Sequence, residues 1–365
     1  MNYSLWLGTI PGIGRKKIKK LREYLGSSKN IYHVSEKDID RLTFLTEKDK
    51  EALKSSRTEQ CLEEKERFLK EHSISFVTQE MEEYPKRLIP LEDAPYLIYY
   101  KGRLPREDMP SIAMIGARNS TPYGEAAARE FSWYFSKHGI QIISGMARGI
   151  DGASQMSAIK AGGQSFGVLG SGIEVCYPAE NITLYQKLKE QGGILSEYAP
   201  MTKPSPGYFP LRNRIISGLS DVVLVVEAKE RSGSLITVEY ALEQGKEVFA
   251  IPGRINDVAS KGCNHLIFEG AGMADTPERI LEAMGWKNAE KGEEKQNRTK
   301  VRLEKNEMMV YSCLGLVPTG LEKIIGETKL PPSEILQILV QLQMQGIIRE
   351  LSKNQYIIEG GYEIR

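Results

Sequence analysis

Short apolar runs alternate with amphipathic segments through the middle of the chain, from Ile112 to Gly253. The runs are IAMIGA, QIISG, FGVLG, VVLVVEA and EVFAIPG, and stretches with helical spacing such as TPYGEAAAREFSWYFSKHG separate them. Strands that are apolar throughout and alternate with helices are typical of a parallel sheet buried on both faces. The pattern therefore predicts an α/β fold with a mostly parallel sheet, helices on both faces, and ligand-binding loops at one edge.

Residues 1–70 have helical spacing and contain a strongly basic stretch. The glycine-containing turn Pro11–Gly14 precedes Arg15–Lys20, where five of six residues are basic. Such a turn can present backbone N–H groups to a phosphate, as in a helix-hairpin-helix. A small SAM-like helical domain with a solvated basic face fits the same residues, and both interpretations stay open.

The segments on either side of position 286 predict the remaining domains. Residues 71–110 include the strand-like run YLIYY, which we expect at the edge of the main sheet, so that 71–286 form one extended domain. Residues 287–300 are charged and poor in apolar residues, which predicts a linker. The tail, 301–365, has three helical patterns and a β-hairpin pattern, typical of a winged helix. Its helix from Ser333 to Gln345 lacks Lys and Arg, which favours packing or partner binding over DNA reading.

The composition excludes recruitment of nucleic acid or membrane by overall charge. The 365 residues include 49 basic and 48 acidic side chains, for a net charge of +1, so polyanion binding must depend on a local cluster. Four scattered cysteines without ligand spacing predict free thiols and no metal site. No apolar run reaches the ~18 residues of a membrane helix. We therefore expect a cytoplasmic protein without membrane contact.

Candidate binding residues follow the predicted strands, in loops that we expect at the same edge of the sheet. The first loop contains Arg118, whose guanidinium suits phosphate. Glycines in the next loops allow a ligand to approach the backbone closely. A later loop places basic groups beside Tyr208 and Phe209, so it could follow a phosphate backbone and stack bases. The candidates are Arg118, Ser144, Gly145, Arg148, Gly149, Gly170, Ser171, Gly172, Lys203, Phe209, Arg212, Asn213, Arg214, Ser232, Gly233, Ser234 and Thr237.

Structural roles compete with binding at several of these positions. Arg212 and Arg214 could instead form internal salt bridges, with Glu197 or Glu227 as partners. Phe209 could pack in the core rather than stack on a base. We expect Glu227 to orient an arginine or a loop and not to act as a general base.

Two nucleotide-binding motifs are absent or incomplete. The sequence has no GxxxxGK[ST], which excludes a P-loop, and Gly170-Ser171-Gly172 lacks the further glycine and the distal acidic residue of dinucleotide sites. No cofactor is therefore expected.

Ordered motifs along nearly the whole chain closely resemble the DNA-processing protein A family, also called Smf. They are IGARNSTPYG, SGMARGIDGASQ, VLGSGIEVCYP, GGILSEY, FPLRNRIISGLS, VVEAKERSGSLITVEYALEQGKEVFAIPG and GCNHLIFEGA. The resemblance implies a Rossmann-like central domain with a small helical N-terminal domain and a winged C-terminal domain.

The resemblance also implies a function. It implies binding of single-stranded DNA without sequence preference, a homodimer formed through the Rossmann-like domain, protection of incoming DNA, and help in loading the RecA recombinase during natural transformation. It implies no catalytic activity, and it assigns DNA contact to Arg118, Arg148, the SGSLIT loop, and the FPxRNR segment that contains Phe209. Ala117 replaces the usual serine and Gln155 the usual histidine, and neither change removes a cationic group.

An enzyme is the alternative on the same fold. SGSLITVEYALE is similar to the PGGxGTxxE phosphate loop of nucleoside-monophosphate phosphoribohydrolases, with Glu239 at the position of the catalytic acid. The PGG is missing, and the polar face of a helix explains Glu239 without chemistry. Release of adenine from AMP would identify the enzyme.

Overall fold

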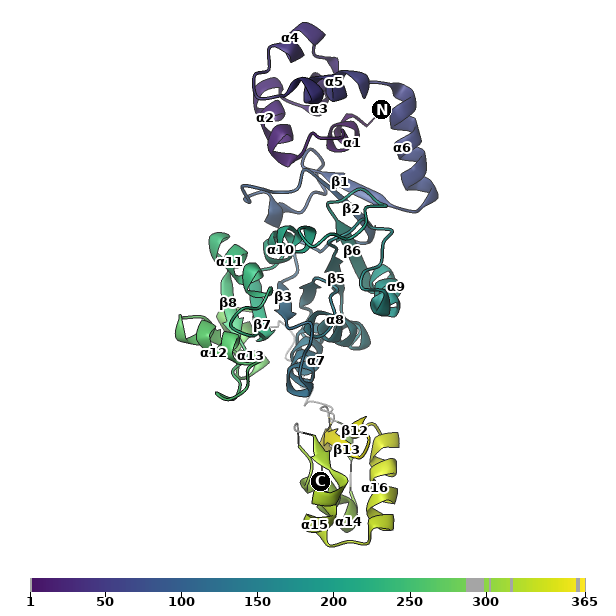
Figure 1. The fold of residues 1–365 in the computed structure, drawn as a ribbon, viewed down its shortest axis with the longest axis vertical. Coiled ribbons are helices and arrows are strands. Elements are labelled where there is room, and N and C mark those ends of the chain that lie inside the picture. Colours follow the sequence, from purple (N-terminus) through teal and green to yellow (C-terminus); the bar gives the residue numbers. More distant parts are fainter. Residues whose placement is uncertain (1, 287–298, 302, 316–317, 359–361, 365) are drawn as a thin grey trace.

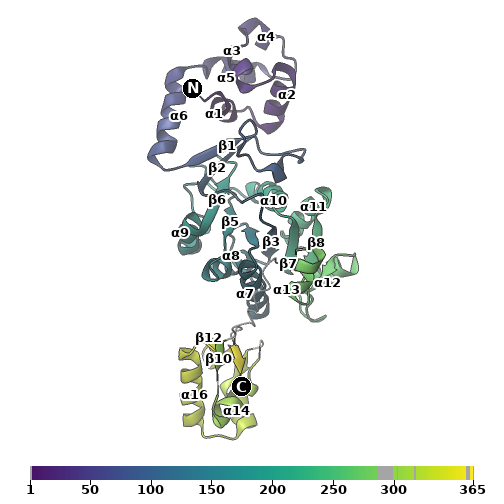
Figure 2. The same ribbon diagram turned by 180° about the vertical axis from the view of Figure 1, so that it is seen from behind.

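The structure is a computed structural model that describes residues 2–286, 299–301, 303–315, 318–358 and 362–364. Figure 1 shows a helical N-terminal part, a central sheet between helices, and a small C-terminal part, arranged along one long axis. Figure 2 shows the same arrangement from behind. Most of the predicted linker, residues 287–298, lies outside the described residues, so the sequence-based domain boundaries stay a prediction.

Six helices precede the sheet, and side-chain caps begin several of them. Ser27, Ser35 and Thr46 each accept a hydrogen bond from the backbone N–H three residues later, and Thr46 forms a full capping box with Asp49. The helices are α1 (Tyr3–Gly8), α2 (Arg15–Leu25), α3 (Ser28–His33), α4 (Glu36–Asp40), α5 (Glu47–Ser55) and α6 (Glu59–Glu71).

The central sheet has nine strands in the order β1-β2-β6-β5-β4-β3-β7-β8-β9. Strand β2 pairs antiparallel with β1 and β6, and the other neighbours pair in parallel. The strands are β1 (Ser75–Thr78), β2 (Leu97–Gly102), β3 (Ser111–Gly116), β4 (Gln141–Ser144), β5 (Ser165–Val168), β6 (Gly192–Ser196), β7 (Val222–Glu227), β8 (Glu247–Ala250) and β9 (Gly272–Met273). The mostly parallel sheet predicted from the apolar runs is confirmed.

Helices cover both faces of this sheet, because alternate strand side chains point to opposite sides. Ile112 and Met114 of β3 lie in one apolar cluster, and Ala113 and Ile115 lie in another. The first cluster includes residues of α7 (Pro122–Lys137), α8 (Ile150–Lys160) and α13 (Pro277–Ala283). The second includes residues of α10 (Tyr208–Gly218), α11 (Leu235–Glu243) and α12 (Lys261–Phe268). Two short 3-10 helices, η1 (Lys86–Leu88) and η2 (Ala179–Asn181), and the helix α9 (Ile182–Gln191) complete this part.

The N-terminal helices share an apolar cluster with the sheet. Leu5 and Trp6 of α1 belong to the same buried cluster as Tyr96, Leu97 and Tyr99, which lie at β2. Helix α1 lies so close to β2 that a Cβ added to Gly8, the last residue of α1, would be 3.0 Å from the Cβ of Leu97. The two parts are therefore joined by common packing rather than by a linker.

The C-terminal part has its own apolar cluster. Its helices are α14 (Lys305–Ser312), α15 (Leu321–Thr328) and α16 (Pro332–Met344), and its strands are β10 (Thr299–Val301), β11 (Thr319–Gly320), β12 (Ile348–Ser352), β13 (Gln355–Ile358) and β14 (Tyr362–Ile364). The hairpin β12–β13 follows three helices, so the predicted winged helix is confirmed.

The order of the strands indicates where a ligand-binding site is expected. The chain passes from β3 through β4 and β5 to β6 in one direction and then returns to β7 on the other side of β3. In open sheets of this kind, ligands bind outside the carboxyl ends of the strands where the order reverses. No helix within the described ranges is long and apolar enough to cross a membrane.

Candidate nucleic-acid interface

The loop after β3 is fixed by a buried carboxylate. Glu227, at the end of β7, accepts hydrogen bonds from the backbone N–H of Thr121, at 2.8 Å, and from its hydroxyl. Thr121 in turn caps α7, which begins at Pro122. The prediction that Glu227 orients a loop is confirmed. Arg118, in the middle of this loop, is exposed.

The loop after β4 contains two residues with positive φ, Met146 at 54° and Gly149 at 70°. Gln155 accepts a hydrogen bond from the Met146 N–H at 3.1 Å and donates one to the carbonyl of Phe166 at 3.0 Å. The residue at the position of the family's usual histidine thus has a structural role. Arg148, between the two residues of positive φ, is exposed.

The Gly149→Ala substitution should lower the free energy of unfolding by about 1–3 kcal/mol. The cause is a left-handed φ combined with overlap of the new Cβ and the Ala117 carbonyl. Gly162→Ala is the matched control, because Gly162 has a φ of 80° but no atom within 4 Å of the added Cβ. Urea denaturation measures the free energy of unfolding of both variants. An equal decrease for both would contradict close packing between the loop after β3 and the loop after β4.

Arg212 lies beneath these loops and is 4% exposed. Its guanidinium donates hydrogen bonds to the carbonyls of Gly145, at 2.7 Å, and Val168. It also interacts with the buried Asp151 carboxylate, which accepts a hydrogen bond from the Gly145 N–H at 3.1 Å. Burial lowers the pKa of Arg212 to about 10 and raises the pKa of Asp151, so Arg212 is still charged at neutral pH.

Arg214 is fully buried and forms two internal ion pairs. Its Nη2 lies 2.8 Å from both carboxylate oxygens of Glu197, and its Nε lies 2.8 Å from Asp93. Its Nη1 donates to the Leu211 carbonyl at 3.0 Å. The alternative of an internal salt bridge with Glu197 is therefore what the structure shows. The prediction that Arg212 and Arg214 face a phosphate is corrected, because both guanidinium groups are occupied inside the protein.

Phe209, at the start of α10, is half-buried against the loop that follows β5. A Cβ on Gly170 would lie 2.6 Å from its ring, so this glycine makes room for the aromatic side chain. The Arg118 guanidinium carbon lies 5.3 Å from the ring centroid, a cation–π arrangement, and the Tyr177 ring is 5.5 Å away. Phe209 therefore combines packing with partial exposure beside a cation.

Other predicted residues support the loops from inside. Ser144 donates to the Met114 carbonyl at 2.6 Å and Ser171 to the Val175 carbonyl at 2.9 Å, so neither hydroxyl is presented to a ligand. Asn213 accepts a hydrogen bond from the Nε of Arg212 at 3.3 Å. Buried positions that belong to this framework are Gly145, Gly170, Gly172 and Thr237. The prediction of direct contact through the side chains of Ser144, Ser171 and Thr237 is corrected by their burial.

The accessible part of the predicted site is smaller. Arg118, Arg148 and Lys203 are exposed, and among the described residues no ion pair involves any of them. At the start of α11 the hydroxyls of Ser232 and Ser234 lie 2.8 Å apart on either side of the exposed Gly233.

Sequence reasoning missed several supporting residues. Tyr177 lies beside Phe209 and is 43% exposed. The sequence could have indicated it, because it is an aromatic residue directly before a proline in the segment that follows β5. Tyr198 stacks on Tyr208 with ring centroids 4.2 Å apart. Asn181 donates to the carbonyls of Met146 and Ala147, at 2.9 and 3.0 Å, a long-range contact that no local pattern indicates.

Glu239, which the enzyme alternative places at the position of the catalytic acid, lies on the exposed side of α11. Within the described ranges, no group of three His, Cys, Asp or Glu side chains could hold a metal ion.

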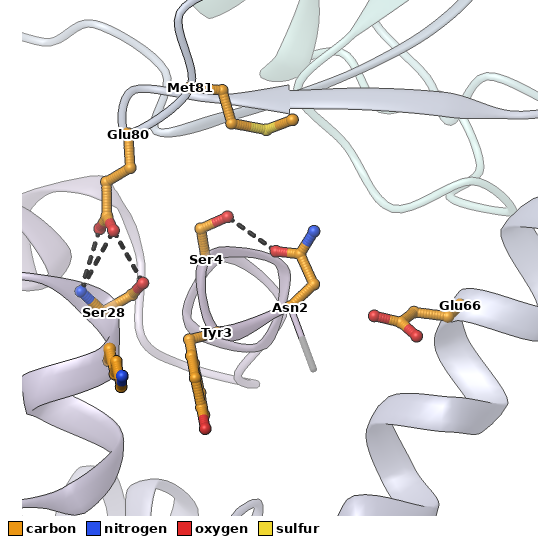
Figure 3. A pocket seen from close by; sticks show the side chains of 8 residues that line it. Asn2, Tyr3, Ser4, Ser28, Glu66, Glu80 and Met81 are labelled. Atoms are coloured by element: carbon orange, nitrogen blue, oxygen red, sulfur yellow. Dashed lines mark hydrogen bonds between the residues drawn. The ribbon is translucent and has the colours of Figure 1, made fainter.

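A separate open hollow of about 570 Å³ lies where α1, α3 and α6 meet the loop after β1 (Figure 3). Its Glu80 carboxylate accepts hydrogen bonds from the backbone and hydroxyl of Ser28 and from Tyr96. This hollow belongs to the packing between two parts of the chain and not to the loops at the sheet edge.

Known proteins of one family match this chain. The family model for DNA recombination-mediator protein A matches residues 75–285, and the model for the DprA winged helix domain matches residues 294–353. DNA processing protein DprA of Streptococcus pneumoniae is 43% identical over 198 residues, which are 54% of this chain and 70% of that protein. Protein Smf of Synechocystis is 30% identical over 320 residues, which are 78% of this chain and 80% of that protein.

Two solved structures of DNA processing protein A are also similar to this chain. The X-ray structure of DNA processing protein A from Streptococcus pneumoniae has a TM-score of 0.67 and 33% identity, and covers 77% of this chain and 97% of its own. The structure of DNA processing protein A from Helicobacter pylori, which concerns a single-stranded DNA binding mode, has a TM-score of 0.53 and 31% identity, and covers 57% of this chain and 95% of its own. With a family model over more than half of its length, this chain belongs to the DNA processing protein A (DprA/Smf) family of DNA recombination mediators.

Proposed function

We propose that the protein binds single-stranded DNA along the carboxyl edge of its central sheet and acts as a recombination mediator in natural transformation. One observation carries the proposal: the exposed Arg118 guanidinium lies over the half-buried ring of Phe209, where the strand order reverses. A cation beside an accessible aromatic ring can bind a phosphate and stack a base at the same place.

The proposed contacts use the groups that the fold leaves accessible. Arg118, Arg148 and Lys203 would meet phosphates, and Phe209 would stack on a base, with Tyr177 beside it. Binding through phosphates and ring faces reads no base edge, so no sequence preference is expected. The buried pair Arg212 and Arg214 would act indirectly, by holding α10 and the loop after β4 in place.

A partner and an assembly state belong to the same proposal. We infer that the protein forms a homodimer through the Rossmann-like domain, where Leu242 of α11 and Phe268 of α12 are 64% and 87% exposed. It would protect incoming DNA in the cytoplasm and help load the RecA recombinase. Faster RecA filament formation on DNA coated by single-strand-binding protein would support this role, and no acceleration would contradict it.

The direct test is titration of the full chain into labelled single-stranded and double-stranded oligonucleotides at two salt concentrations. We expect tighter binding of the single strand and a clear loss of affinity as salt rises. Equal affinity for the duplex would overturn the proposal. Incubation with AMP and assay for free adenine tests the alternative of a nucleoside-monophosphate phosphoribohydrolase, and release of adenine would support that enzyme.

Substituting Phe209 by alanine should weaken single-stranded DNA binding by about 1–2 kcal/mol, because one stacking surface is lost. Phe209→Tyr keeps the ring and should bind as the unmodified protein does. Phe209→Leu keeps apolar packing against Gly170 but has no ring to stack. Full affinity of the leucine variant, with folding confirmed by circular dichroism, would show that Phe209 only packs.

A further inference from the structure

Helix α2 has one largely exposed face, where the Lys20 ammonium contacts the Phe44 ring, 5.9 Å from its centroid. Ile18 and Leu21 are buried, and Lys17 lies 2.6 Å from the Asp49 carboxylate. Two arginines lie on the side that faces the sheet. Arg15 lies 3.4 Å from Asp93, and Arg22 lies 3.4 Å from Glu80 in the loop after β1. The remaining, exposed face consists of Lys16, Lys19, Lys20, Glu23 and Tyr24.

This face has the composition of a phosphate-binding surface. Three of its five side chains are lysines and one is acidic, and among the described residues no ion pair involves any of the three lysines. Lys16, Lys20 and Tyr24 follow each other at intervals of four residues, about 6 Å along the helix. Tyr24 is 72% exposed, so an aromatic ring extends the basic stripe. Lysines with a free ring suit a nucleic-acid backbone with unpaired bases.

Ion pairs connect helix α2 to α10, the helix that begins beside the sheet edge. Arg214 of α10 pairs with Asp93, and Asp93 also pairs with Arg15 of α2. Tyr208, beside Phe209 at the start of α10, stacks on Tyr198. Figures 1 and 2 agree that α2 and α10 lie on the same flank of the molecule, with the segment between β1 and β2 between them.

We propose that a single DNA strand leaving the sheet edge continues over α10 onto the exposed face of α2, where Lys16, Lys19 and Lys20 bind its phosphates. This inference rests on the proposed function and extends it to a second segment of the same strand. A protein partner fits the face less well, because Tyr24 is its one large apolar side chain. Helix α2 then adds affinity only for a strand long enough to reach it.

The test compares two lengths of oligonucleotide and two triple variants of the full chain. The variant Lys16→Gln, Lys19→Gln, Lys20→Gln removes the basic face and keeps good helix formers. The control Lys37→Gln, Lys48→Gln, Lys70→Gln removes the same charge from exposed positions on α4, α5 and α6. Affinities are measured for single strands of about 6 and about 30 nucleotides over a range of salt concentrations, since compact single-strand sites span roughly 4–16 nucleotides.

The expected result is a loss for the long strand alone. Three phosphate contacts contribute about 0.7 each to the salt slope, so the slope should fall by about 2 for the α2 variant on the long strand. When the salt concentration falls about tenfold, from roughly 0.5 M to roughly 0.05 M, the ratio of the affinity of the unmodified protein to that of the α2 variant should therefore rise by about 100-fold. The short strand should bind all proteins equally, and the control variant should bind the long strand as the unmodified protein does.

Three outcomes would overturn the inference: an unchanged long-strand affinity, an equal loss in the control variant, or an equal loss on the short strand. Arg118→Ala separates this failure from a failure of the proposed function. If Arg118→Ala weakens binding of both lengths while the α2 variant binds normally, only the path over α2 is wrong. If Arg118→Ala has no effect on either length, the site at the sheet edge is wrong.

Discussion

Arg118→Ala should weaken single-stranded DNA binding by about 1.5–3 kcal/mol, roughly 10- to 150-fold, to the same extent for every DNA sequence. The substitution removes an accessible cation and also the group that lies over the Phe209 ring. Because one phosphate contact is lost, the slope of log affinity against log salt should fall by about 0.7. Fluorescence anisotropy titrations at several salt concentrations measure both quantities.

Arg103→Ala provides the matched control for this loss. Arg103 is exposed and follows β2, where its backbone N–H bonds the carbonyl of Gly192 at the beginning of β6. It therefore lies at the amino edge of the parallel strands, opposite the proposed site. Removing this arginine changes the net charge equally and should leave affinity and salt slope unchanged. Equal losses for the two variants would mean that binding depends on overall charge and not on the carboxyl edge.

Arg214→Ala should lower the free energy of unfolding by about 3–5 kcal/mol. The guanidinium is fully buried between the carboxylates of Glu197 and Asp93. Its removal leaves the Glu197 carboxylate, 17% exposed, without a counter-charge, whereas Asp93 is 34% exposed and keeps its pair with Arg15. Arg214→Lys should recover little of this loss, because one ammonium nitrogen cannot replace three guanidinium nitrogens that bond Asp93, Leu211 and Glu197 separately. Guanidinium chloride denaturation of the full chain measures the differences.

An exposed ion pair of the same type is the control for this substitution. Arg129 pairs with Glu125 on α7 at 2.6 Å, with side chains 39% and 31% exposed, so Arg129→Ala should cost less than about 1 kcal/mol. Combining Arg214→Ala with Glu197→Gln should recover part of the loss, since the uncompensated charge is then reduced. A small loss for Arg214→Ala, similar to that for Arg129→Ala, would contradict a structural role and return Arg214 to the candidates for DNA contact.

The sequence predicted the sheet because its strands are apolar throughout, and burial on both faces requires that pattern. Arg118 could be located as well, since an arginine in a loop between a strand and a capped helix has few internal partners nearby. For Arg212 and Arg214 the sequence left two alternatives open, phosphate contact and internal ion pairing. A basic helix near a binding edge has the same sequence whether its arginines point out or in, and only the fold brings Asp93 and Glu197 to α10.

The sequence also could not predict how many of the candidate binding residues are accessible. Glycines and serines after strands fit either a ligand contact or close packing of loops, and the structure shows packing at Gly145, Gly172 and Ser171. Long-range contacts decide such cases, as where Asn181 bonds the loop after β4. Their partners are separated by about 35 residues, and no spacing rule connects them.

The apolar cluster common to α1 and β2 limits how the protein can be divided for experiments. A truncated chain that begins near residue 71 would leave Tyr96, Leu97 and Tyr99 facing water in place of the helices that normally cover them. Such a fragment is expected to aggregate or to lose the β1–β2 edge. Inactivity of the fragment would then report damage at that edge, so point substitutions in the intact polypeptide are the sounder way to assign roles to its parts.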